Sequence, residues 1–318
     1  MKKPLIVLTG PTAAGKTHLS IALAKAVNGE IISADSMQVY KYMDIGSAKI
    51  RPEEMQGVKH YLVDELLPQE EFHIVKFQQM AKAAMEEIYA KGKIPVLVGG
   101  TGFYIQAVLN DIAFTKEKQG DEIRADLQNL AKEKGASYLH HELQKVDKES
   151  AEAIHPNNIK RVIRALEYFQ STGQKFSDHN KEERQKGSPY NFLYLVLTMN
   201  REVLYERIDK RVDQMMEEGL VKEVKELLDA GYSRNLVSMQ GLGYKEIASA
   251  LFKECTMEEA VYRLKRDTRH FAKRQMTWFR RERDVTMIDK DNFLNNHEIV
   301  NYIMKLAAEK GICSCREG

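Results

Sequence analysis

The sequence predicts an α/β protein built on a parallel sheet, with an all-helical domain inserted into it and a helical C-terminal region. Short apolar runs alternate with helical patterns through the first hundred residues, the stretch 116–189 shows helices but no strand, and another apolar run follows near residue 192. Strands that alternate with helices are typical of a parallel sheet covered on both faces. We therefore divide the chain into a first part of the α/β core (1–115), an inserted helical domain (116–189), and the completion of the core with basic C-terminal helices (190–318).

Five apolar runs have the length and composition of buried strands. They are residues 5–9, 30–34, 94–98 and 192–197, with 60–64 as a weaker fifth. Helical periodicity occurs at 17–27, 72–91, 122–134 and 158–171. Gly173 is expected to end the last of these helices, because glycine favours helix ends. Residues 174–188 are polar and aperiodic, which predicts a loop long enough to be mobile or functional.

The region after residue 200 is mostly helical in pattern. Asn200 is placed to cap a helix, because its side chain can accept hydrogen bonds from the first amides. The apolar positions predict the buried face of this helix. They are Val203, Leu204, Ile208, Val212 and Met215.

Composition places the chain among ordinary globular proteins. Of its 318 residues, 43% are hydrophobic and 30% are charged. There is no apolar run of about 18 residues and no signal-peptide pattern, so we expect no membrane span and a cytoplasmic location. The cysteines Cys255, Cys313 and Cys315 fit a reducing compartment, and Cys313 with Cys315, in a polar tail without a nearby histidine, does not make a zinc site.

Charge is balanced over the chain but not along it. The formal net charge is +2, whereas the segment 263–283 holds nine basic residues against two acids, Asp267 and Glu282. Such a concentrated basic patch indicates an anionic partner such as a nucleic acid.

The strongest motif is Gly-Pro-Thr-Ala-Ala-Gly-Lys-Thr at residues 10–17, which matches G-x-x-x-x-G-K-[ST]. It follows a predicted strand and opens a predicted helix, as a P-loop requires. The glycines let backbone N–H groups turn towards phosphate oxygens, and the helix N-terminus adds positive potential. Lys16 offers a point charge to the outer phosphates, and Thr17 offers a hydroxyl ligand to Mg²⁺. The alternative, a glycine turn without a ligand, does not explain the lysine and threonine.

Two further segments end strands at what should be the same rim. The strand 94–98 runs into Gly99-Gly100-Thr101-Gly102, without the acid that NTPases usually carry there. Thr101 is placed to donate to a phosphate, although a tight strand-to-helix turn would also explain these residues. Asp35 directly follows the strand 30–34, where a carboxylate can take a proton from a nucleophile. Its alternatives are a helix cap or an outer contact to Mg²⁺.

Six motifs, in order, resemble those of the bacterial tRNA dimethylallyltransferases. They are GPTAAGKT (10–17), DSMQVYKYMDIGSAK (35–49), VGGTGFY (98–104), HPNNIKRVIRALE (155–167), GLGYKEI (241–247) and DTRHFAKRQMTWFR (267–280). The resemblance covers most of the chain and implies a P-loop NTPase-like core with an inserted helical domain. It also implies transfer of a dimethylallyl group from dimethylallyl diphosphate to N6 of the adenosine 3′ of the anticodon in tRNA, by a monomer that uses Mg²⁺.

The resemblance assigns roles residue by residue. Asp35 is the expected general base, with Lys16 and Thr101 as further catalytic residues and Thr17 on the metal. The expected diphosphate contacts are Gly10, Thr12, Ala13, Ala14, Gly15, Lys16 and Thr17. The P-loop then holds the pyrophosphate leaving group instead of ATP. Arg124 is an expected substrate contact, but it follows residues 114–123 that lack the family's proline, which puts its position in doubt.

The segments implied to face the anticodon stem-loop of tRNA come from four places in the chain. They are Asp35, Ser36, Met37 and Gln38; Lys160, Arg161, Val162, Ile163 and Arg164; Gln240, Gly241, Leu242, Gly243, Tyr244 and Lys245; and Lys273, Arg274, Gln275, Met276, Thr277, Trp278, Phe279 and Arg280. Aromatic and basic side chains suit a single-stranded RNA loop. At helical spacing, however, Phe271, Trp278 and Phe279 are of a kind that is more often core than base platform.

Two competing functions remain at this point. A P-loop nucleoside or small-molecule kinase would use Asp35 to deprotonate a hydroxyl while ATP fills the loop. An RNA-binding module with a vestigial P-loop would need neither Asp35 nor the intact pair of Lys16 and Thr17.

Overall fold

The computed structural model describes residues 2–114 and 120–313. The chain forms two compact units: Asn110–Ser188 is one, and the segments before and after it together form the other. The first is the inserted helical domain that the sequence predicts at 116–189, with its start six residues earlier. Among the described residues, no helix is long and apolar enough to cross a membrane.

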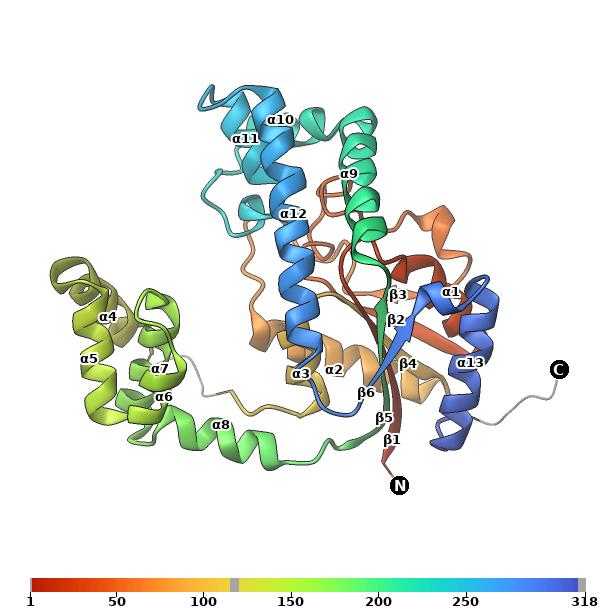
Figure 1. Ribbon diagram of the computed structural model, residues 1–318, viewed down its shortest axis with the longest axis horizontal. Helices are drawn as coiled ribbons and strands as arrows, with labels where there is room; N and C mark the ends of the chain where they lie inside the picture. Colours follow the sequence, from red (N-terminus) through yellow and green to blue (C-terminus); the bar gives the residue numbers. More distant parts are fainter. Residues whose placement is uncertain (1, 115–119, 314–318) are drawn as a thin grey trace. The chain divides into compact units, whose positions relative to one another are not determined.

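The larger unit is built on a six-stranded sheet in the order β3-β2-β4-β1-β5-β6, and every pair of neighbours is parallel (Figure 1). The strands are β1 (Lys3–Thr9), β2 (Gly29–Ala34), β3 (His60–Tyr61), β4 (Ile94–Gly99), β5 (Tyr190–Thr198) and β6 (Val285–Asp289). The predicted parallel sheet is confirmed. The edge strand β6 was not predicted, because its five residues are short and only Ile288 is buried.

Register brings three strand ends to one rim. Gly99, the last residue of β4, pairs with Thr9 at the end of β1 and with Ala34 at the end of β2. The loops that follow these strands are the P-loop, the Asp35 loop and the Gly99–Gly102 turn. They therefore start side by side at the carboxyl edge of the sheet, where parallel sheets bind ligands.

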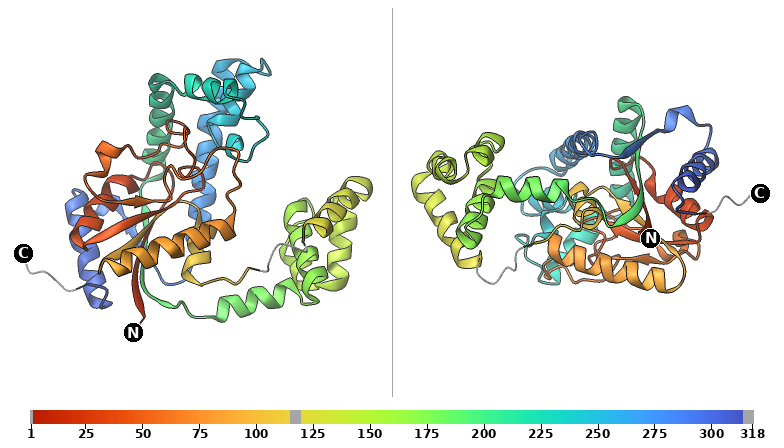
Figure 2. Two further views of the ribbon diagram at one scale, coloured as in Figure 1. Left: turned by 180° about the vertical axis from the view of Figure 1, so that it is seen from behind. Right: turned by 90° about the horizontal axis from the view of Figure 1, so that it is seen from below.

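Helices cover both faces because the side chains of the strands are apolar on both. Along β1, Leu5 and Val7 point to one core, and Ile6 and Leu8 point to the other. The helices α1 (Lys16–Ala26) and α13 (Asn296–Glu309) lie side by side over the second core (Figure 2). The first core is covered by α2 (Ile74–Ala90), α3 (Gly102–Leu109), α10 (Leu220–Asp229), α11 (Tyr244–Leu251) and α12 (Met257–Phe279).

The helix α9 (Arg201–Glu218) begins as the sequence predicts. Asn200 Oδ1 accepts hydrogen bonds from the amides of Glu202 at 2.8 Å and Val203 at 3.4 Å. Leu204, Ile208 and Val212 are buried on its inner face. Val203 was predicted to be buried but is 44% exposed, because it lies a full helical step of about 100° away from that stripe.

The helical unit has a core of its own. Its helices are α4 (Gly120–Lys134), α5 (Ala136–Val146), α6 (Lys148–Ala153), α7 (Ile159–Thr172) and α8 (Phe176–Gln185). Gly173 ends α7 in the left-handed region at φ 71°, as predicted. The predicted loop at 174–188 was wrong, because α8 occupies most of it. This helix is almost entirely polar, and its start is held by tertiary contacts: the amide of Ser177 donates to the buried Asp147 carboxylate at 2.8 Å.

Candidate functional site

The P-loop has the backbone of an anion-binding nest. It connects β1 to α1, and its residues Gly10, Ala13 and Gly15 have φ values of 149°, 62° and 83°. A Cβ at Gly10 would lie 2.7 Å from the carbonyl oxygen of Leu197, so only glycine fits there. Left-handed residues interspersed in a turn aim successive N–H groups into one concavity, which suits phosphate oxygens. The positive φ of Ala13 costs free energy, and such strain is characteristic of ligand-binding loops.

Lys16 lies over this loop. Its ammonium donates to the carbonyl oxygens of Gly10 at 2.9 Å and Pro11 at 2.8 Å. Burial lowers the pKa of Lys16 to about 8, the negative charge of Asp35 opposes that shift, and the positive charge of Arg211 adds to it. The lysine is thus desolvated and held where an anion would restore its full charge. Thr17, the next residue, is exposed at the first turn of α1.

Three further cations lie near the loop, and sequence reasoning missed all of them. A Cβ at Gly15 would be 3.0 Å from Lys290 Nζ and 3.4 Å from Arg207 Nη2. Lys290 follows β6 and donates to the carbonyl oxygen of Ala14 at 3.4 Å, and both burial and the charge of Arg207 lower the pKa of Lys290. Arg211, one turn after Arg207 on α9, has its pKa lowered by burial. The i, i+4 spacing of the two arginines was a visible signal, whereas Lys290 belongs to a strand end that the sequence did not reveal.

Asp35 is held by its own loop. Its Oδ1 accepts hydrogen bonds from the amides of Met37 at 2.8 Å and Gln38 at 3.4 Å, so the capping alternative describes one of its oxygens. Its Oδ2 has no hydrogen-bond partner among the described residues. The carboxylate is close enough to Lys16 and Arg211 that its negative charge partly offsets the lowering of their pKa values by burial. Asp35 is therefore oriented through one oxygen and available to a ligand through the other.

The second glycine turn packs against both neighbouring loops. The amide of Thr101 donates to the carbonyl oxygen of Ala34 at 3.3 Å, and the hydroxyl of Thr9 donates to that of Gly99 at 2.6 Å. A Cβ at Gly99 would lie 2.2 Å from Ala34 O. Residues 99–102 therefore form a tight turn between β4 and α3. Thr101 is half-buried in this turn, at the same rim as Asp35 and the P-loop.

Gln275, on α12, connects the P-loop to the Gly99–Gly102 turn. Its side chain is buried, its Oε1 accepts from the amide of Thr12 at 2.9 Å, and its Nε2 donates to the carbonyl oxygen of Gly100 at 2.9 Å. The expectation that Gln275 faces tRNA is corrected here, because both ends of its amide are engaged by the protein. Trp278, one turn further, lies against Gly102, where a Cβ would be 2.3 Å from its ring.

Five more of the expected RNA-facing residues turn out to be buried. Val162 and Ile163 belong to the core of the helical unit, and Gly243, Tyr244 and Phe279 lie inside the larger unit. The hydroxyl of Tyr244 donates to Glu223 at 2.7 Å, which in turn accepts the amides of the loop 44–46. These side chains stabilise the fold and do not reach RNA; the family motif marks the segment and not each residue in it.

The other expected RNA-facing residues are at least partly accessible. Those exposed are Lys160, Arg161, Gln240, Lys273, Arg274, Thr277, Trp278 and Arg280, and those half-buried are Asp35, Ser36, Met37, Gln38, Arg164, Gly241, Leu242, Lys245 and Met276. Of the three aromatics discussed above, only Phe279 is fully buried, and Phe271 is half-buried beneath the guanidinium of Arg274.

The basic segment 263–283 divides into two halves. In the first half, Arg263, Lys265, Arg266 and Arg269 each form an ion pair with a carboxylate. In the second half, Lys273, Arg280, Arg281 and Arg283 form no ion pair with any residue that the structure describes. The uncompensated charge is thus concentrated at the C-terminal end of α12, the end that carries Gln275 and Trp278.

Arg124 and the C-terminal cysteines lie outside the loops of the P-loop rim in the sequence. Arg124 forms a two-point ion pair with the buried Glu167, at 2.8 Å and 3.2 Å, inside the helical unit. Its expected role as a substrate contact stays a prediction; residues 115–119 just before it lie outside the described chain. Cys313 is half-buried, and Cys315 lies outside the described residues. The described residues contain no group of three or more His, Cys, Asp or Glu that could hold a metal ion.

Comparison with known proteins agrees with this geometry. The model of the family described as IPP transferase matches residues 38–282. The tRNA dimethylallyltransferase of Lachnoclostridium phytofermentans is 60% identical over 310 residues, which is 98% of this chain and 99% of the relative. The crystal structure of full-length tRNA isopentenylpyrophosphate transferase from Bacillus halodurans has a TM-score of 0.74 at 45% identity, with 98% of each chain covered. A eukaryotic dimethylallyltransferase, seen in crystallographic snapshots acting on tRNA, has a TM-score of 0.83 at 29% identity over 99% of this chain and 81% of that one.

Proposed function

Because this chain belongs to the IPP transferase family, we propose that it transfers a dimethylallyl group from dimethylallyl diphosphate to N6 of the adenosine directly 3′ of the anticodon in tRNA. The observation that carries the proposal is the make-up of the rim. Lys16, Arg207, Arg211 and Lys290 provide positive charge at the P-loop, and Asp35 stands beside them with one unpaired oxygen. This arrangement suits an anionic leaving group next to a site of proton removal.

The cations would act on the leaving group. As the carbon–oxygen bond to the diphosphate breaks, its electron pair departs with pyrophosphate, and the allylic carbon develops positive charge. Preorganised donors aimed at the developing charge are commonly the largest catalytic contribution. The P-loop amides and Lys16, whose ammonium donates to the carbonyl oxygens of Gly10 and Pro11, are placed to supply them.

Asp35 would act on the nucleophile. The lone pair of adenine N6 is delocalised into the ring, so N6 is a weak nucleophile that must lose a proton as the new carbon–nitrogen bond forms. Oδ2 of Asp35 accepts that proton, while Oδ1 keeps the carboxylate oriented through the amides of Met37 and Gln38. Water would capture the allylic cation, so the adenine must leave its stack and close the site.

Thr17 is the residue that would hold Mg²⁺, together with oxygens of the diphosphate. Thr17 is exposed at the N-terminus of α1, and the described residues offer no carboxylate cage. This fits Mg²⁺, which keeps several waters and binds through few protein ligands plus substrate phosphates. When bound, the ion neutralises charge on the departing pyrophosphate.

The tRNA would be held by the exposed basic residues of each unit. Lys160 and Arg161 provide them in the helical unit, and Lys273, Arg274 and Arg280 provide them in the larger one. A monomer acting in the cytoplasm remains our expectation. The kinase alternative is disfavoured, because β4 ends in glycines and not in the acid that NTPases usually use.

A transfer assay tests the proposal against the kinase. The protein and Mg²⁺ are incubated with unmodified tRNA and dimethylallyl diphosphate labelled in the dimethylallyl group, and separately with ATP. We expect label in the RNA, competitive inhibition of diphosphate use by inorganic pyrophosphate, and negligible ATP turnover. Rapid ATP turnover without label in the RNA would reject the transferase and support the kinase.

A further inference from the structure

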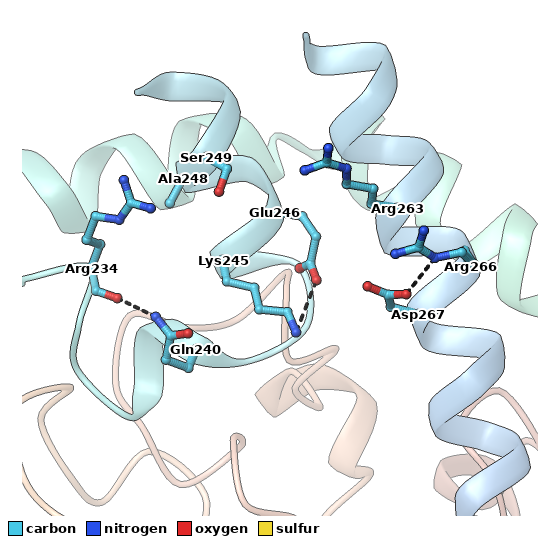
Figure 3. A pocket seen from close by; sticks show the side chains of 9 residues that line it. All are labelled: Arg234, Gln240, Lys245, Glu246, Ala248, Ser249, Arg263, Arg266 and Asp267. Atoms are coloured by element: carbon cyan, nitrogen blue, oxygen red, sulfur yellow. Dashed lines mark hydrogen bonds and ion pairs between the residues drawn. The ribbon is translucent and has the colours of Figure 1, made fainter. Parts of the chain in front are cut away.

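A polar cleft lies in the larger unit, apart from the loops of the P-loop rim. Its volume is about 520 Å³, and it opens between α11, the loop before it, and the first half of α12 (Figure 3). That volume is within the range of about 300–1,000 Å³ that is usual for small-ligand sites. No residue of the P-loop, the Asp35 loop or the Gly99–Gly102 turn lines it.

Glu246 carries a buried oxygen without a hydrogen-bond donor in the wall of this cleft. Its side chain is almost fully buried, and Oε2 accepts from the amide of Gly243 at 2.9 Å, which caps α11. Oε1 accepts no hydrogen bond from any described residue, and the ammonium of Lys245 stands 3.5 Å away. The carboxylate points into the space between α11 and α12 (Figure 3). A buried acceptor without a donor costs free energy, so a ligand with an N–H group that donates to this oxygen would be stabilised.

The opposite wall supplies both signs of charge. Arg266 holds Asp267 at 2.8 Å, and that hydrogen bond keeps the pKa of Asp267 below its usual value. Arg263 lines the same wall, and Lys245 completes the basic side. A free phosphate would meet two carboxylates here, Glu246 and Asp267, and so would the side chains of an acidic peptide. A nucleotide suits both the carboxylates and the basic side chains of the cleft. Its base offers N–H donors and carbonyl acceptors, and its phosphates offer negative charge.

We propose that this cleft binds one unstacked guanine or uracil nucleotide of the tRNA, other than the adenosine that is modified. Only these two bases carry an imino N–H next to a carbonyl oxygen. The N–H donates to Glu246 Oε1, and the carbonyl accepts from Lys245 or an arginine. The inference rests on the proposed function for its ligand, tRNA, and adds a second point at which the RNA sequence is read.

The substitution E246Q tests the hydrogen-bond polarity. Glutamine can still accept from the amide of Gly243 through its oxygen, so the cap on α11 is kept, but it then turns an NH₂ donor towards the cleft. We expect the tRNA dissociation constant to rise about tenfold, the usual scale for one base contact, with thermal stability and pyrophosphate affinity unchanged. If the substitution acted only by removing a negative charge, it would strengthen RNA binding and lower the dissociation constant. Loss of the base contact raises the dissociation constant, so the direction of the change distinguishes the two explanations. E226Q, which removes an exposed carboxylate of α10 away from the cleft, is the matched control and should bind tRNA as the wild type does.

Abasic substitutions identify the nucleotide. Anticodon stem-loop RNAs with one loop base removed at a time are titrated against wild type and E246Q. At a single guanine or uracil position, removing the base should weaken binding to the wild type but not to E246Q. Equal losses for both proteins at every position, or tRNA binding by E246Q as tight as by the wild type, would overturn the proposal. Transfer by the wild type is measured on intact RNA in parallel, so that failure of the proposed function (no transfer) is separate from failure of the cleft proposal (no coupling).

Discussion

At the scale of single residues, Asp35 shows what sequence reasoning can and cannot resolve. Its position after β2 was predictable from the strand pattern, and so was its place at the rim. The sequence left open whether it caps a turn or acts as a base. The structure assigns the capping to Oδ1 and leaves Oδ2 without a described partner, so that the two roles no longer compete.

Asp35→Asn separates those roles. Asparagine keeps an oxygen that can accept the amides of Met37 and Gln38, so the loop and both substrate affinities should be retained. Loss of the base should lower single-turnover transfer by roughly 10²–10⁴-fold, the usual worth of general base catalysis. Rapid-quench measurement at saturating tRNA and diphosphate checks this. Transfer within about tenfold of the wild type would remove Asp35 from the role of base.

Lys16 predicts a pH dependence of anion binding. Its pKa of about 8 means that the free protein loses this charge as pH rises through that value. A bound diphosphate favours the charged form, so above about pH 8 binding must take up a proton and the affinity falls by up to about tenfold per pH unit. The check is the dissociation constant of inorganic pyrophosphate from about pH 7 to about pH 9.5, since linkage requires data on both sides of the pKa. Lys16→Arg, which stays charged, reports the titration of pyrophosphate itself. Identical pH profiles for the two proteins would contradict the assignment.

At the scale of elements, the helix α12 connects two loops of the rim through Gln275 and also carries the basic residues that we expect to contact RNA. The sequence showed its basic charge and its aromatic spacing but not the contact of Gln275 with two loops far away in the chain. Such contacts depend on tertiary packing, and a buried glutamine leaves no trace in periodicity. The same limit explains α8, whose polar sequence is held by Asp147, and β6, a short edge strand.

Gln275→Leu tests the connection between the two loops. The amide of Thr12 and the carbonyl of Gly100 lose their partner, so we expect a loss of about 1–3 kcal/mol in the free energy of unfolding and weaker pyrophosphate binding. Thr277→Ala, on the exposed side of the same helix, should change stability by no more than about 0.5 kcal/mol. Urea denaturation and pyrophosphate titration of both variants check this. Unchanged pyrophosphate affinity in Gln275→Leu would mean that the P-loop does not depend on α12.

The uncompensated end of α12 predicts a salt effect. If Lys273, Arg274 and Arg280 contact RNA phosphates, each alanine substitution should flatten the log–log salt dependence of tRNA affinity by about 0.7. Lys265→Ala removes a cation that is paired with Asp213 at 2.6 Å and serves as the control with an unchanged slope. Titrations at several salt concentrations decide between RNA contact and a solvated helix face. Parallel lines for all the proteins would show that this end of the helix does not touch tRNA phosphates.

At the scale of the whole molecule, much of the fold and the centre of the site were predictable. Strand-helix alternation predicted the parallel sheet, and the rule that parallel strands end at one edge predicted that the P-loop, Asp35 and Thr101 lie together. The cations Arg207, Arg211 and Lys290 could not be assigned, because they reach the rim from α9 and β6 after long separations in sequence. The buried Val162, Ile163 and Tyr244 show the converse: a motif can mark a segment whose central residues serve the core.

The most direct test of the whole account counts pyrophosphate released against label transferred, on two tRNAs that differ in one atom group. One tRNA carries adenosine 3′ of the anticodon, and the other carries inosine, which has oxygen in place of the N6 amine. We expect equal amounts of pyrophosphate and RNA-bound dimethylallyl group with adenosine, and neither with inosine. Label in the inosine tRNA, or pyrophosphate released without label in the adenosine tRNA, would contradict it.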